Sequence, residues 1–434
     1  MAHELRDGIR EGRLADGTRL PSSRRLASAL AVSRGVVEDA YAQLAAEGYL
    51  EQPNRARPVV RAAALHTPPA GTSSPIRPLH DLSATTPDLS LFPRAAWARA
   101  ERDVLRRVPD ELLGYGSPLG PALFRQAVAA RLGRTRGACT TADGVIATSG
   151  FTQAVDLVAR TLVRNGARRV AVEDPGFDEQ VATLGGAGLE VVPVPVDAAG
   201  LRVDLLPALG VDAVVVSPAH QFPTGAVLAA ERRRELASWA VTNDRLLIED
   251  DYDSEYRYDR QPVGALQGLA PDHVILLGTT AKMLAPALRI GWIVAPPHLV
   301  ADISATRYSA DSMPATLPLL AYAALADGGA LDRHLRHTRK QYAARRAALL
   351  AGLAGRRVTG AAAGLHVVLE LEPGRDEAVA DVLTRDRVRV RTLASYTLDE
   401  RNRRAGLVIG YGRLREAEIP QALAVLERAL ALSD

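Results

Sequence analysis

The sequence contains one cysteine, Cys139, among its 434 residues. A single thiol cannot form an internal disulfide framework or a multi-cysteine zinc or iron–sulfur site. No apolar run approaches the roughly 18 residues of a membrane span. The first residues, MAHELRDGIREG, are charged where a secretory signal would have its apolar core, and the nine histidines show no metal-ligand spacing. We therefore expect a cytoplasmic protein without a membrane segment or a bound metal.

Lysine is nearly absent as well, because only Lys282 and Lys340 stand beside 51 arginines. The net charge of +3 is too small for a general nucleic-acid coat, although it leaves room for a local basic surface. Arginine replaces lysine on most solvated surfaces but cannot act as an amine nucleophile, since the guanidinium keeps its proton. A retained lysine is therefore a mild indication of amine chemistry, although two ordinary surface lysines explain the composition equally simply.

The composition, with 47% hydrophobic and 24% charged residues, is that of an ordinary folded protein long enough for two or three domains. Residues 1–61 predict a small helical domain. Residues 62–79 are rich in Pro, Gly, Ser and Thr, which is typical of a linker. Residues 80–434 form the remaining, larger domain.

Two short helices are predicted in the first domain. RLPSSRRLASAL predicts a helix capped by Ser22 or Ser23, and a second helix begins at Ser33. Joined by the short segment Ala31-Val32, the pair is typical of a helix-turn-helix motif whose second helix reads DNA. The β-prone residues after Gly48 could form a wing.

The basic residues of this motif are candidate DNA contacts. Arg24, Arg25, Ser33 and Arg34 lie where helix-turn-helix proteins touch phosphates or bases. A solvated helix face is the usual place for arginine, but this spacing favours DNA contact.

From residue 80 onward, strand and helix patterns alternate, which predicts an α/β domain. Near-continuous apolar runs occupy 168–174, 189–195, 211–218, 245–250, 273–279 and 289–296. Such runs are typical of a buried, mainly parallel sheet. Residues 331–353 predict a long amphipathic helix that leads to a small C-terminal subdomain.

Chemically useful side chains follow several of these strands. In open α/β sheets, ligands bind at the carboxyl ends of the strands. The loops supply a helix N-terminus for a phosphate, an aromatic ring, a carboxylate, a phenol and an amine, at Ser149–Thr152, Phe177, Asp250, Tyr252 and Lys282. Pyridoxal phosphate requires a lysine and a carboxylate of this kind. Each group alone is common, but the ordered set predicts a site for this cofactor.

Here a family resemblance becomes visible. Residues 12–50 follow the GntR pattern GxLxxGTRLPSSRxLAxxLxVSRxxVxxAYxQLxxEGYL, and the whole chain resembles the MocR-type subfamily of GntR regulators. The larger domain resembles the fold type I aminotransferases, and its motifs that match the subfamily include YGSPLG (115–120), EDPGF, SPAHQFPTG, EDDYDSEYRY (249–258), the Lys282 segment and AGLHVVLEL (363–371). The resemblance implies an N-terminal winged helix-turn-helix domain fused to an α/β fold type I aminotransferase-like domain. It also implies bound pyridoxal 5'-phosphate, operator DNA as partner and a homodimer.

The resemblance implies roles for individual residues. Lys282 would form the Schiff base, Asp250 would pair with the pyridine nitrogen, and Tyr252 would hydrogen-bond to the ring hydroxyl. Phe177 would stack on the ring, and Tyr115 would reach the phosphate from the other subunit. The phosphate itself would be held by Arg289, Thr279, Gly150, Phe151 and Thr152.

The chain departs from the family at the substrate end of the site. The arginine that grips the substrate carboxylate in many aminotransferases should fall near Leu407 or Val408, and neither is basic. The possible replacements are Arg403, Arg404 and Arg413. Phe222 stands where aminotransferases have asparagine, so that His220 or Gln221 could substitute.

Acidic residues follow the stacking aromatic residue. If Asp178 and Glu179 line the pocket, they favour a cation; alternatively, they cap the next helix from the solvent side. We therefore expect an effector that is an amine without a nearby carboxylate, or a free form of the cofactor.

Two functions are open at this point. The chain is either a pyridoxal-phosphate-dependent transcription regulator that senses a small amine or the cofactor itself, or an active aminotransferase with a vestigial DNA-binding domain. The missing carboxylate-binding arginine favours the regulator. A structural regulator that binds neither ligand conflicts with the complete set of Lys282, Asp250, Tyr252 and Arg289.

Overall fold

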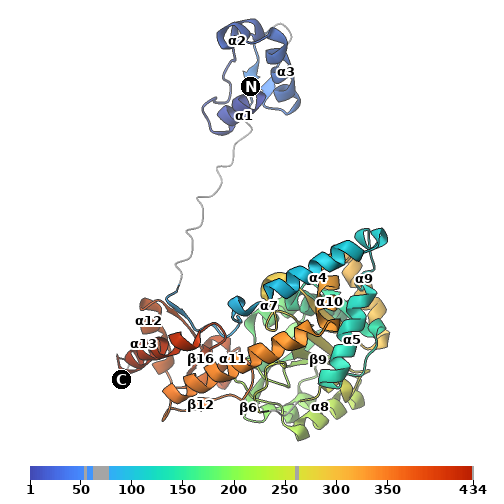
Figure 1. Ribbon diagram of the computed structural model, residues 1–434, viewed down its shortest axis with the longest axis vertical. Coiled ribbons are helices and arrows are strands. Elements are labelled where there is room, and N and C mark those ends of the chain that lie inside the picture. The colour runs from blue at the N-terminus through green and yellow to red at the C-terminus, as the bar shows by residue number, and fades with distance from the viewer. Residues whose placement is uncertain (53–55, 62–77, 260–262, 433–434) are drawn as a thin grey trace. The chain divides into compact units, whose positions relative to one another are not determined.

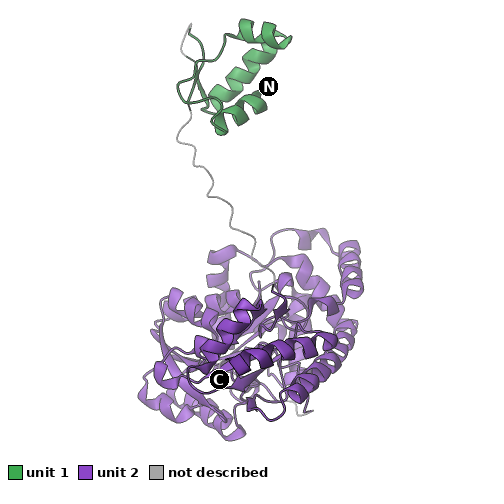
Figure 2. Cartoon of the chain, turned by 90° about the vertical axis from the view of Figure 1, so that its left-hand side faces the viewer, with its two compact units in different colours: residues 1–76 green, residues 77–434 purple. Residues whose placement is uncertain are grey.

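The computed structural model describes residues 1–52, 56–61, 78–259 and 263–432. It divides into two compact units, residues 1–76 and 77–434 (Figure 2). Most of the linker expected over 62–79 lies outside the described residues. Across the described ranges, no helix is both long and apolar enough to cross a bilayer.

The first unit consists of three helices and a two-stranded antiparallel ribbon. Its elements are α1 (Ala2–Arg10), α2 (Ser23–Leu30), α3 (Arg34–Ala46), β1 (Leu50–Glu51) and β2 (Val59–Val60). Their shared core is formed by Ile9, Leu20, Ala27, Val37, Tyr41, Leu44, Leu50 and Val60. The ribbon lies where the wing was predicted, and the residues between its strands at 53–55 lie outside the described part.

Side-chain caps define the two helices of the predicted motif. The Ser22 hydroxyl accepts a hydrogen bond from the backbone N–H of Arg25, and the Ser33 hydroxyl accepts one from that of Val36. Each bond satisfies an N–H that would otherwise lack a partner at a helix start. Between the helices, Ala31 adopts a left-handed conformation with φ of 54° and ends α2. The helix predicted to begin at Ser33 begins at Arg34 with Ser33 as its N-cap, and of the two predicted caps of α2 it is Ser22 that caps the helix.

An eight-stranded sheet forms the centre of the second unit (Figure 1). In spatial order its strands are β4 (Val145–Thr148), β11 (Gly291–Val294), β10 (Val274–Thr279), β9 (Leu246–Asp251), β8 (Ala213–Val216), β5 (Arg169–Asp174), β6 (Glu190–Asp197) and β7 (Gly200–Leu201). Neighbouring strands from β10 to β6 are parallel, whereas β11 is antiparallel to both of its neighbours and β7 is antiparallel to β6. The predicted mainly parallel sheet is confirmed.

Helices cover both faces of this sheet, which explains why its strands are almost wholly apolar. On one face, α6 (Phe151–Arg164), α7 (Asp178–Gly186) and α9 (Pro297–Asp311) pack on alternate strand residues such as Ile146 and Ile248. On the other face lie α5 (Ala122–Arg136), α8 (Ala230–Asn243) and α10 (Thr316–Asp327).

The small subdomain is built on a four-stranded antiparallel sheet. In spatial order its strands are β12 (Val358–Thr359), β13 (His366–Glu370), β16 (Gly406–Gly410) and β15 (Arg391–Thr392). Two helices pack with it, α12 (Arg375–Arg385) and α13 (Ile419–Leu432), and the long helix α11 (Ala330–Gly352) leads into it, as the sequence predicted (Figure 1). A separate parallel pair joins β3 (His80–Asp81) to β14 (Val388–Arg389). This pairing connects the first residues of the unit to its C-terminal part.

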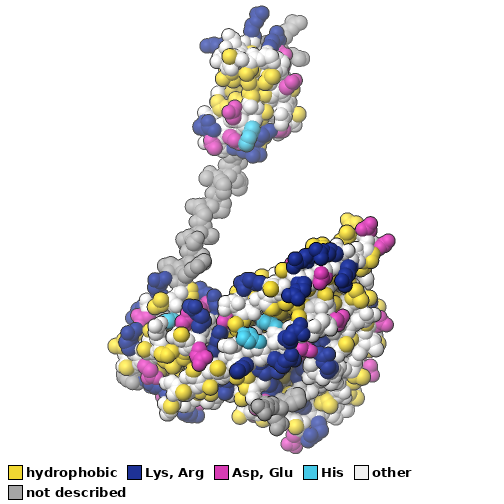
Figure 3. All heavy atoms as spheres, viewed as in Figure 1, with side chains coloured by type: hydrophobic (Ala, Val, Ile, Leu, Met, Phe, Trp, Pro, Cys, Tyr) yellow, Lys and Arg dark blue, Asp and Glu magenta, His cyan; other side chains and the backbone are white. Residues whose placement is uncertain are grey.

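Basic side chains gather on one face of the second unit. Figure 3 shows them over α11 and over α4 (Arg94–Arg107). Arg106, Arg107 and Arg336 are among the exposed arginines of these helices. The protein therefore has a local basic surface although its net charge is small.

Candidate functional site

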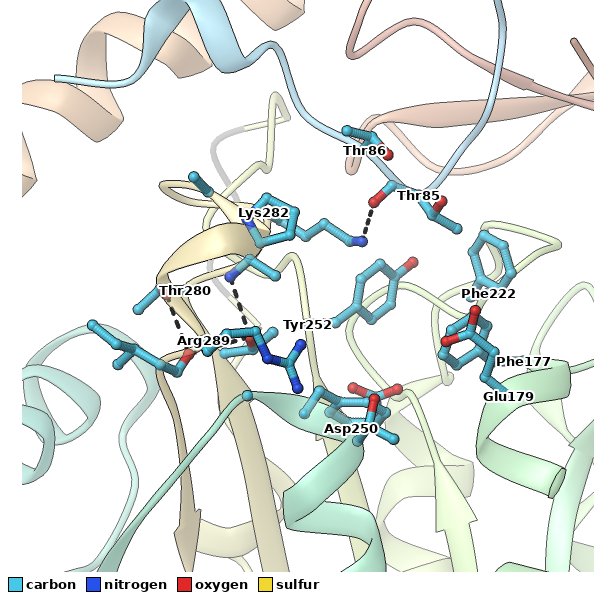
Figure 4. Close-up of a pocket in the computed structure, with 18 of the residues that line it drawn as sticks. Thr85, Thr86, Phe177, Glu179, Phe222, Asp250, Tyr252, Thr280, Lys282 and Arg289 are labelled. Carbon is cyan, nitrogen blue, oxygen red and sulfur yellow. Dashed lines mark hydrogen bonds between the residues drawn. The ribbon is translucent and has the colours of Figure 1, made fainter. Parts of the chain in front are cut away.

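A cavity of about 290 Å³ opens at the carboxyl ends of the central strands. Nine of the ten residues expected at the cofactor line it, contributed by the starts of α6 and α7 and by the ends of β9 and β10 with the loops that follow them (Figure 4). These nine are Gly150, Phe151, Thr152, Phe177, Asp250, Tyr252, Thr279, Lys282 and Arg289. The tenth, Tyr115, is 97% exposed and does not line the cavity of its own chain.

One end of the cavity is built for an anion. Gly150 caps α6 with φ of 87°, and Phe151 and Thr152 of the first helical turn line the cavity. The N–H groups of a first helical turn lack partners within the helix and favour an anion. A β-carbon on Gly150 would lie 3.1 Å from the guanidinium carbon of Arg289, which shows how closely the arginine approaches this helix start. Thr279 supports the same loop: its hydroxyl accepts from the N–H of Ala281 and donates to the carbonyl of Ile290.

Lys282 lies in the loop after β10, with its amine inside the cavity. Its Nζ donates a hydrogen bond to the backbone carbonyl of Thr85, as Figure 4 shows. Burial lowers the pKa of this amine, although the nearby carboxylates of Asp253, Asp250 and Glu179 oppose the change. A lowered pKa increases the fraction of neutral, nucleophilic amine at a given pH.

Buried carboxyl groups lie beneath the cavity. Burial, together with the neighbouring Asp251, Asp253 and Glu173, raises the pKa of Asp250 well above its ordinary value. Its Oδ1 is buried and has no hydrogen-bond partner among the described residues. Glu173 is fully buried, accepts from the N–H of Ser217 at 2.9 Å, and has its pKa raised to about 8 by burial. Asp250 is therefore an acceptor that a cationic or N–H group in the cavity would satisfy.

Aromatic rings close the side of the cavity opposite the lysine (Figure 4). The rings of Phe177 and Phe222 meet edge to face, with centroids 5.7 Å apart, and Tyr252 packs edge-on against Phe222 at 6.3 Å. Val408 and Leu393 lie behind these rings in the same apolar cluster. Sequence reasoning did not identify Phe222 as a wall of the cavity.

Among the described residues that line the cavity, the basic side chains are Lys282 and Arg289. None of these lining residues is an arginine that could replace the missing carboxylate-binding arginine, because Arg289 lies at the anion-binding end. Leu407 and Val408 are buried in β16. The three possible replacements pair with carboxylates elsewhere: Arg403 with Glu377, Arg404 with Glu370, and Arg413 with Asp81.

The two acidic residues after Phe177 were expected either to line the cavity or to cap the next helix from the solvent side, and they differ in this respect. Both open α7, where acidic side chains favour the helix dipole. Asp178 forms an ion pair with Arg391 at 3.0 Å, and the Arg391 guanidinium lies 4.0 Å from the ring centroid of Tyr396. Glu179, by contrast, lines the cavity.

His220 and Gln221 lie next to the cavity rather than in its lining. Gln221 is buried and donates through Nε2 to the carbonyl of Pro175 at 2.8 Å. The Nδ1 atom of His220 lies 2.8 Å from Asp253 and 3.0 Å from the Tyr252 hydroxyl. Thus His220 contacts the cavity lining through Tyr252, and the sequence did not predict this contact.

Two threonines from a distant part of the chain complete the lining. Thr85 and Thr86 follow β3, nearly 200 residues before Lys282, and reach the cavity (Figure 4). The pairing of β3 with β14 anchors this segment to the unit. Their residue types carry no local signal of a site, which is why sequence reasoning missed them.

The candidate DNA contacts lie in the first unit, on and beside the two capped helices. Arg24 and Arg25 are exposed on the first turn of α2. Arg34 is the first residue of α3 and forms an exposed ion pair with Glu38 at 2.7 Å. Ser33 is the N-cap of the same helix.

Comparisons with known proteins agree with this two-unit organisation. Residues 1–60 match the family of bacterial regulatory proteins of the gntR type, and residues 79–415 match the aminotransferase class I and II family. The chain is 32% identical over 442 residues to the HTH-type pyridoxine biosynthesis transcriptional regulator PdxR of Corynebacterium glutamicum, covering 100% of this chain and 95% of that protein. It is 33% identical over 374 residues to the probable rhizopine catabolism regulatory protein MocR of Rhizobium meliloti, covering 81% and 76%.

Solved structures show the same fold in enzymes. An archaeal alanine:glyoxylate aminotransferase superposes with a TM-score of 0.75 at 26% identity, covering 81% of this chain and 91% of that one. The Pyrococcus horikoshii kynurenine aminotransferase gives a TM-score of 0.74 at 24% identity, covering 81% and 90%.

The cavity fits pyridoxal 5'-phosphate, the cofactor implied by this aminotransferase fold. The unpartnered Oδ1 of Asp250, the glycine-capped helix under Arg289 and the buried amine of Lys282 each match one part of that molecule. The chain therefore belongs to the MocR-type GntR regulators, in which a GntR helix-turn-helix domain is fused to a pyridoxal-phosphate-binding domain of the class I and II aminotransferase family.

Proposed function

We propose that the chain is a DNA-binding transcription regulator whose DNA affinity responds to an amine-bearing effector, or to the cofactor itself, at the Lys282 cavity. One observation carries the proposal: nine of the ten expected cofactor residues line the cavity, whereas the residues at the carboxylate-binding position are the buried, apolar Leu407 and Val408. Residues 1–61 would bind operator DNA in the cytoplasm, 62–79 would act as linker, and 80–434 would sense the effector.

Different residues of the cavity would bind different parts of the cofactor. When bound, pyridoxal phosphate supplies an aldehyde that captures amines covalently and a ring that withdraws electrons from them. The buried amine of Lys282 would hold it covalently, and Asp250 would keep a proton on the ring nitrogen. The α6 N-terminus and Arg289 would bind the phosphate, while Phe177 would pack on the ring.

The effector class follows from the charges of the cavity. A plain amino acid needs a partner for its carboxylate, and burying an unpaired carboxylate costs several kcal/mol. Phe177 and Phe222 line this side of the cavity with Val408 packed behind them, whereas Glu179 lines the cavity and favours a cation. An amine without a nearby carboxylate, a diamine, or a free form of the cofactor fits this environment. The similarity to PdxR, named as a pyridoxine biosynthesis regulator, supports the last of these.

A homodimer belongs to the proposal. Tyr115 is almost fully exposed and lies outside the cavity of its own chain, so it is free to contact a second copy. Light scattering of the full chain is expected to give twice the 46.3 kDa mass, and a monomer at micromolar concentration contradicts this part.

The proposal is tested by absorbance of the full chain reconstituted with excess cofactor. A visible band is expected, and borohydride should attach the cofactor permanently to Lys282. The Lys282→Ala variant should lack the band. A wild-type protein without any such band contradicts the proposal.

The effector is tested by titration of that band. Diamines, alanine, glutamate and γ-aminobutyrate are added in turn, and diamines are expected to change the spectrum most strongly. Glu179→Gln should weaken the diamine response, whereas Asp178→Asn, at the neighbouring residue paired with Arg391, should leave it nearly unchanged. A strong response to glutamate or γ-aminobutyrate with none to diamines would show that an arginine does grip the carboxylate.

A further inference from the structure

A buried histidine contacts both the phenol of the cavity and a carboxylate behind it. The Nδ1 of His220 lies 2.8 Å from Asp253 Oδ2 and 3.0 Å from the Tyr252 hydroxyl. His220 and Asp253 are 2% and 4% exposed, so water competes little for these contacts. The rings of His220 and Tyr252 are nearly stacked, at 6.2 Å and 29°.

The position of the hydrogens follows from the donor and acceptor types. A carboxylate only accepts, so Nδ1 of His220 carries the hydrogen and donates it to Asp253. The same N–H also faces the Tyr252 oxygen, which accepts from it in a three-centre arrangement. The Nε2 of His220 is buried and has no hydrogen-bond partner among the described residues, which agrees with a ring protonated on Nδ1.

The phenol keeps its own hydrogen and has two places to donate it. Burial and the charges of Asp253, Asp250 and Glu173 raise the pKa of Tyr252 well above 10. The Asp253 carboxylate contacts the same Nδ1 of His220 as this hydroxyl does, and it is therefore one neighbouring acceptor. The other acceptor is whatever oxygen enters the cavity that Tyr252 lines.

Other charged or titratable neighbours among the described residues include Lys282, His366 and Arg257, whose guanidinium donates to the carbonyl of Ala219. Lys282 is in the cavity lining with Tyr252, and the rings of His366 and His220 lie 4.9 Å apart. Nε2 of His366 donates to the carbonyl of Pro223 at 3.0 Å. Its pKa is lowered well below 6.5, mainly by burial, so His366 adds no positive charge beside His220 at neutral pH.

The histidine ring is also held in place. A β-carbon on Gly364 would lie 2.0 Å from Cε1 of His220, so this backbone packs directly on the ring. Gly364 has φ of 65°, a conformation that glycine adopts without strain.

We propose that His220 is a positioning residue: by donating to Asp253, it leaves the phenol hydrogen of Tyr252 free to bind the ring hydroxyl oxygen of the cofactor. The inference rests on the proposed function, because it requires the bound cofactor. Without a donor at position 220, Tyr252 donates to Asp253 instead. The deprotonated ring oxygen then loses a hydrogen bond, and the lysine-bound cofactor holds its proton to higher pH.

The test is a spectrophotometric pH titration of the full chain with bound cofactor. His220→Phe and the smaller His220→Ala both lack a donor, and both are expected to raise the titration midpoint by about one pH unit, a tenfold change in the proton-dissociation constant. His220→Asn retains an N–H donor and should restore a midpoint close to wild type. In a Tyr252→Phe background, His220→Phe should cause no further shift.

Each contrary outcome is distinct. Unchanged midpoints in His220→Phe and His220→Ala, a shift in His220→Asn as large as in His220→Phe, or an undiminished shift in the Tyr252→Phe background would overturn the positioning role. A wild-type protein that shows no visible band overturns the proposed function, and this inference with it. A wild-type band with no effect of His220 leaves the proposed function standing and removes only the inference.

Discussion

Replacing Gly150 with alanine should weaken cofactor binding through its phosphate. The residue has φ of 87° and ψ of −178°, a region populated almost only by glycine, so alanine costs about 1–3 kcal/mol in folding stability. The new β-carbon would lie 3.1–3.2 Å from three atoms of the Arg289 guanidinium, which must shift by a few tenths of an ångström. A hydrogen bond to a charged group contributes about 1.5–3 kcal/mol, so a weakened arginine contact should reduce affinity by up to about 10- to 100-fold.

A substitution at the glycine just beyond the other end of α6 serves as a control, because it introduces backbone strain without affecting the phosphate contact. Gly166, just after α6, has φ of 96°, and a β-carbon added there would meet no other atom within 4 Å. Gly166→Ala should therefore lose similar stability in chemical unfolding but keep its cofactor affinity.

The assay is an absorbance titration of each variant with pyridoxal phosphate and with pyridoxal, which lacks the phosphate. Gly150→Ala should lose affinity for pyridoxal phosphate and little for pyridoxal. Equal losses for both ligands, or an equal loss in Gly166→Ala, would refute the assignment of this helix start to the phosphate.

Three further changes test other parts of the site. Glu173→Gln should flatten the pH dependence of the stability of the cofactor-free protein. Burial raises the pKa of Glu173 from 4.5 to about 8, so the stabilisation from its protonated form is present below pH 4.5 and is lost as the pH rises toward 8, by up to about 5 kcal/mol. Urea unfolding at several pH values measures this, and the same change of unfolding free energy with pH in wild type and variant contradicts it. Asp250→Asn should weaken cofactor binding by about 3 kcal/mol, since the ring nitrogen loses its buried charged partner, and dialysis equilibrium that matches wild type would refute it. Arg34→Ala should weaken binding to promoter DNA by about 1–3 kcal/mol, whereas Arg13→Ala, an arginine equally exposed at 65% against 64%, should not; anisotropy with labelled promoter DNA compares the two.

Local signals predicted much of this protein. The starts of α2 and α3 were predicted to within one residue from residue type, because a serine hydroxyl at a helix start accepts from an N–H only three residues away. The apolar runs predicted the strands, because a sheet covered on both faces requires them. The strand-end loops then brought Lys282 and Asp250 to one cavity, as open α/β sheets do.

Contacts between distant segments could not be predicted in the same way. Thr85 reaches the cavity from a segment anchored by strands more than 300 residues apart in the sequence. Arg391 pairs with Asp178 across 213 positions, and this pair separates the role of Asp178 from that of Glu179. The contact of His220 with Tyr252 likewise depends on the relative placement of two loops. The residue types and spacing of Thr85 and Arg391 do not distinguish them from ordinary loop or surface residues.

The central claim is that the cofactor cavity controls DNA binding, and one measurement tests it most directly. The affinity of the full chain for its own promoter DNA is measured by fluorescence anisotropy with and without pyridoxal phosphate, for wild type and Lys282→Ala. Coupling between two sites is typically 5- to 150-fold, so the wild-type affinity should change at least about fivefold with the cofactor, and that of Lys282→Ala should not. Identical affinities in all four conditions would contradict the account.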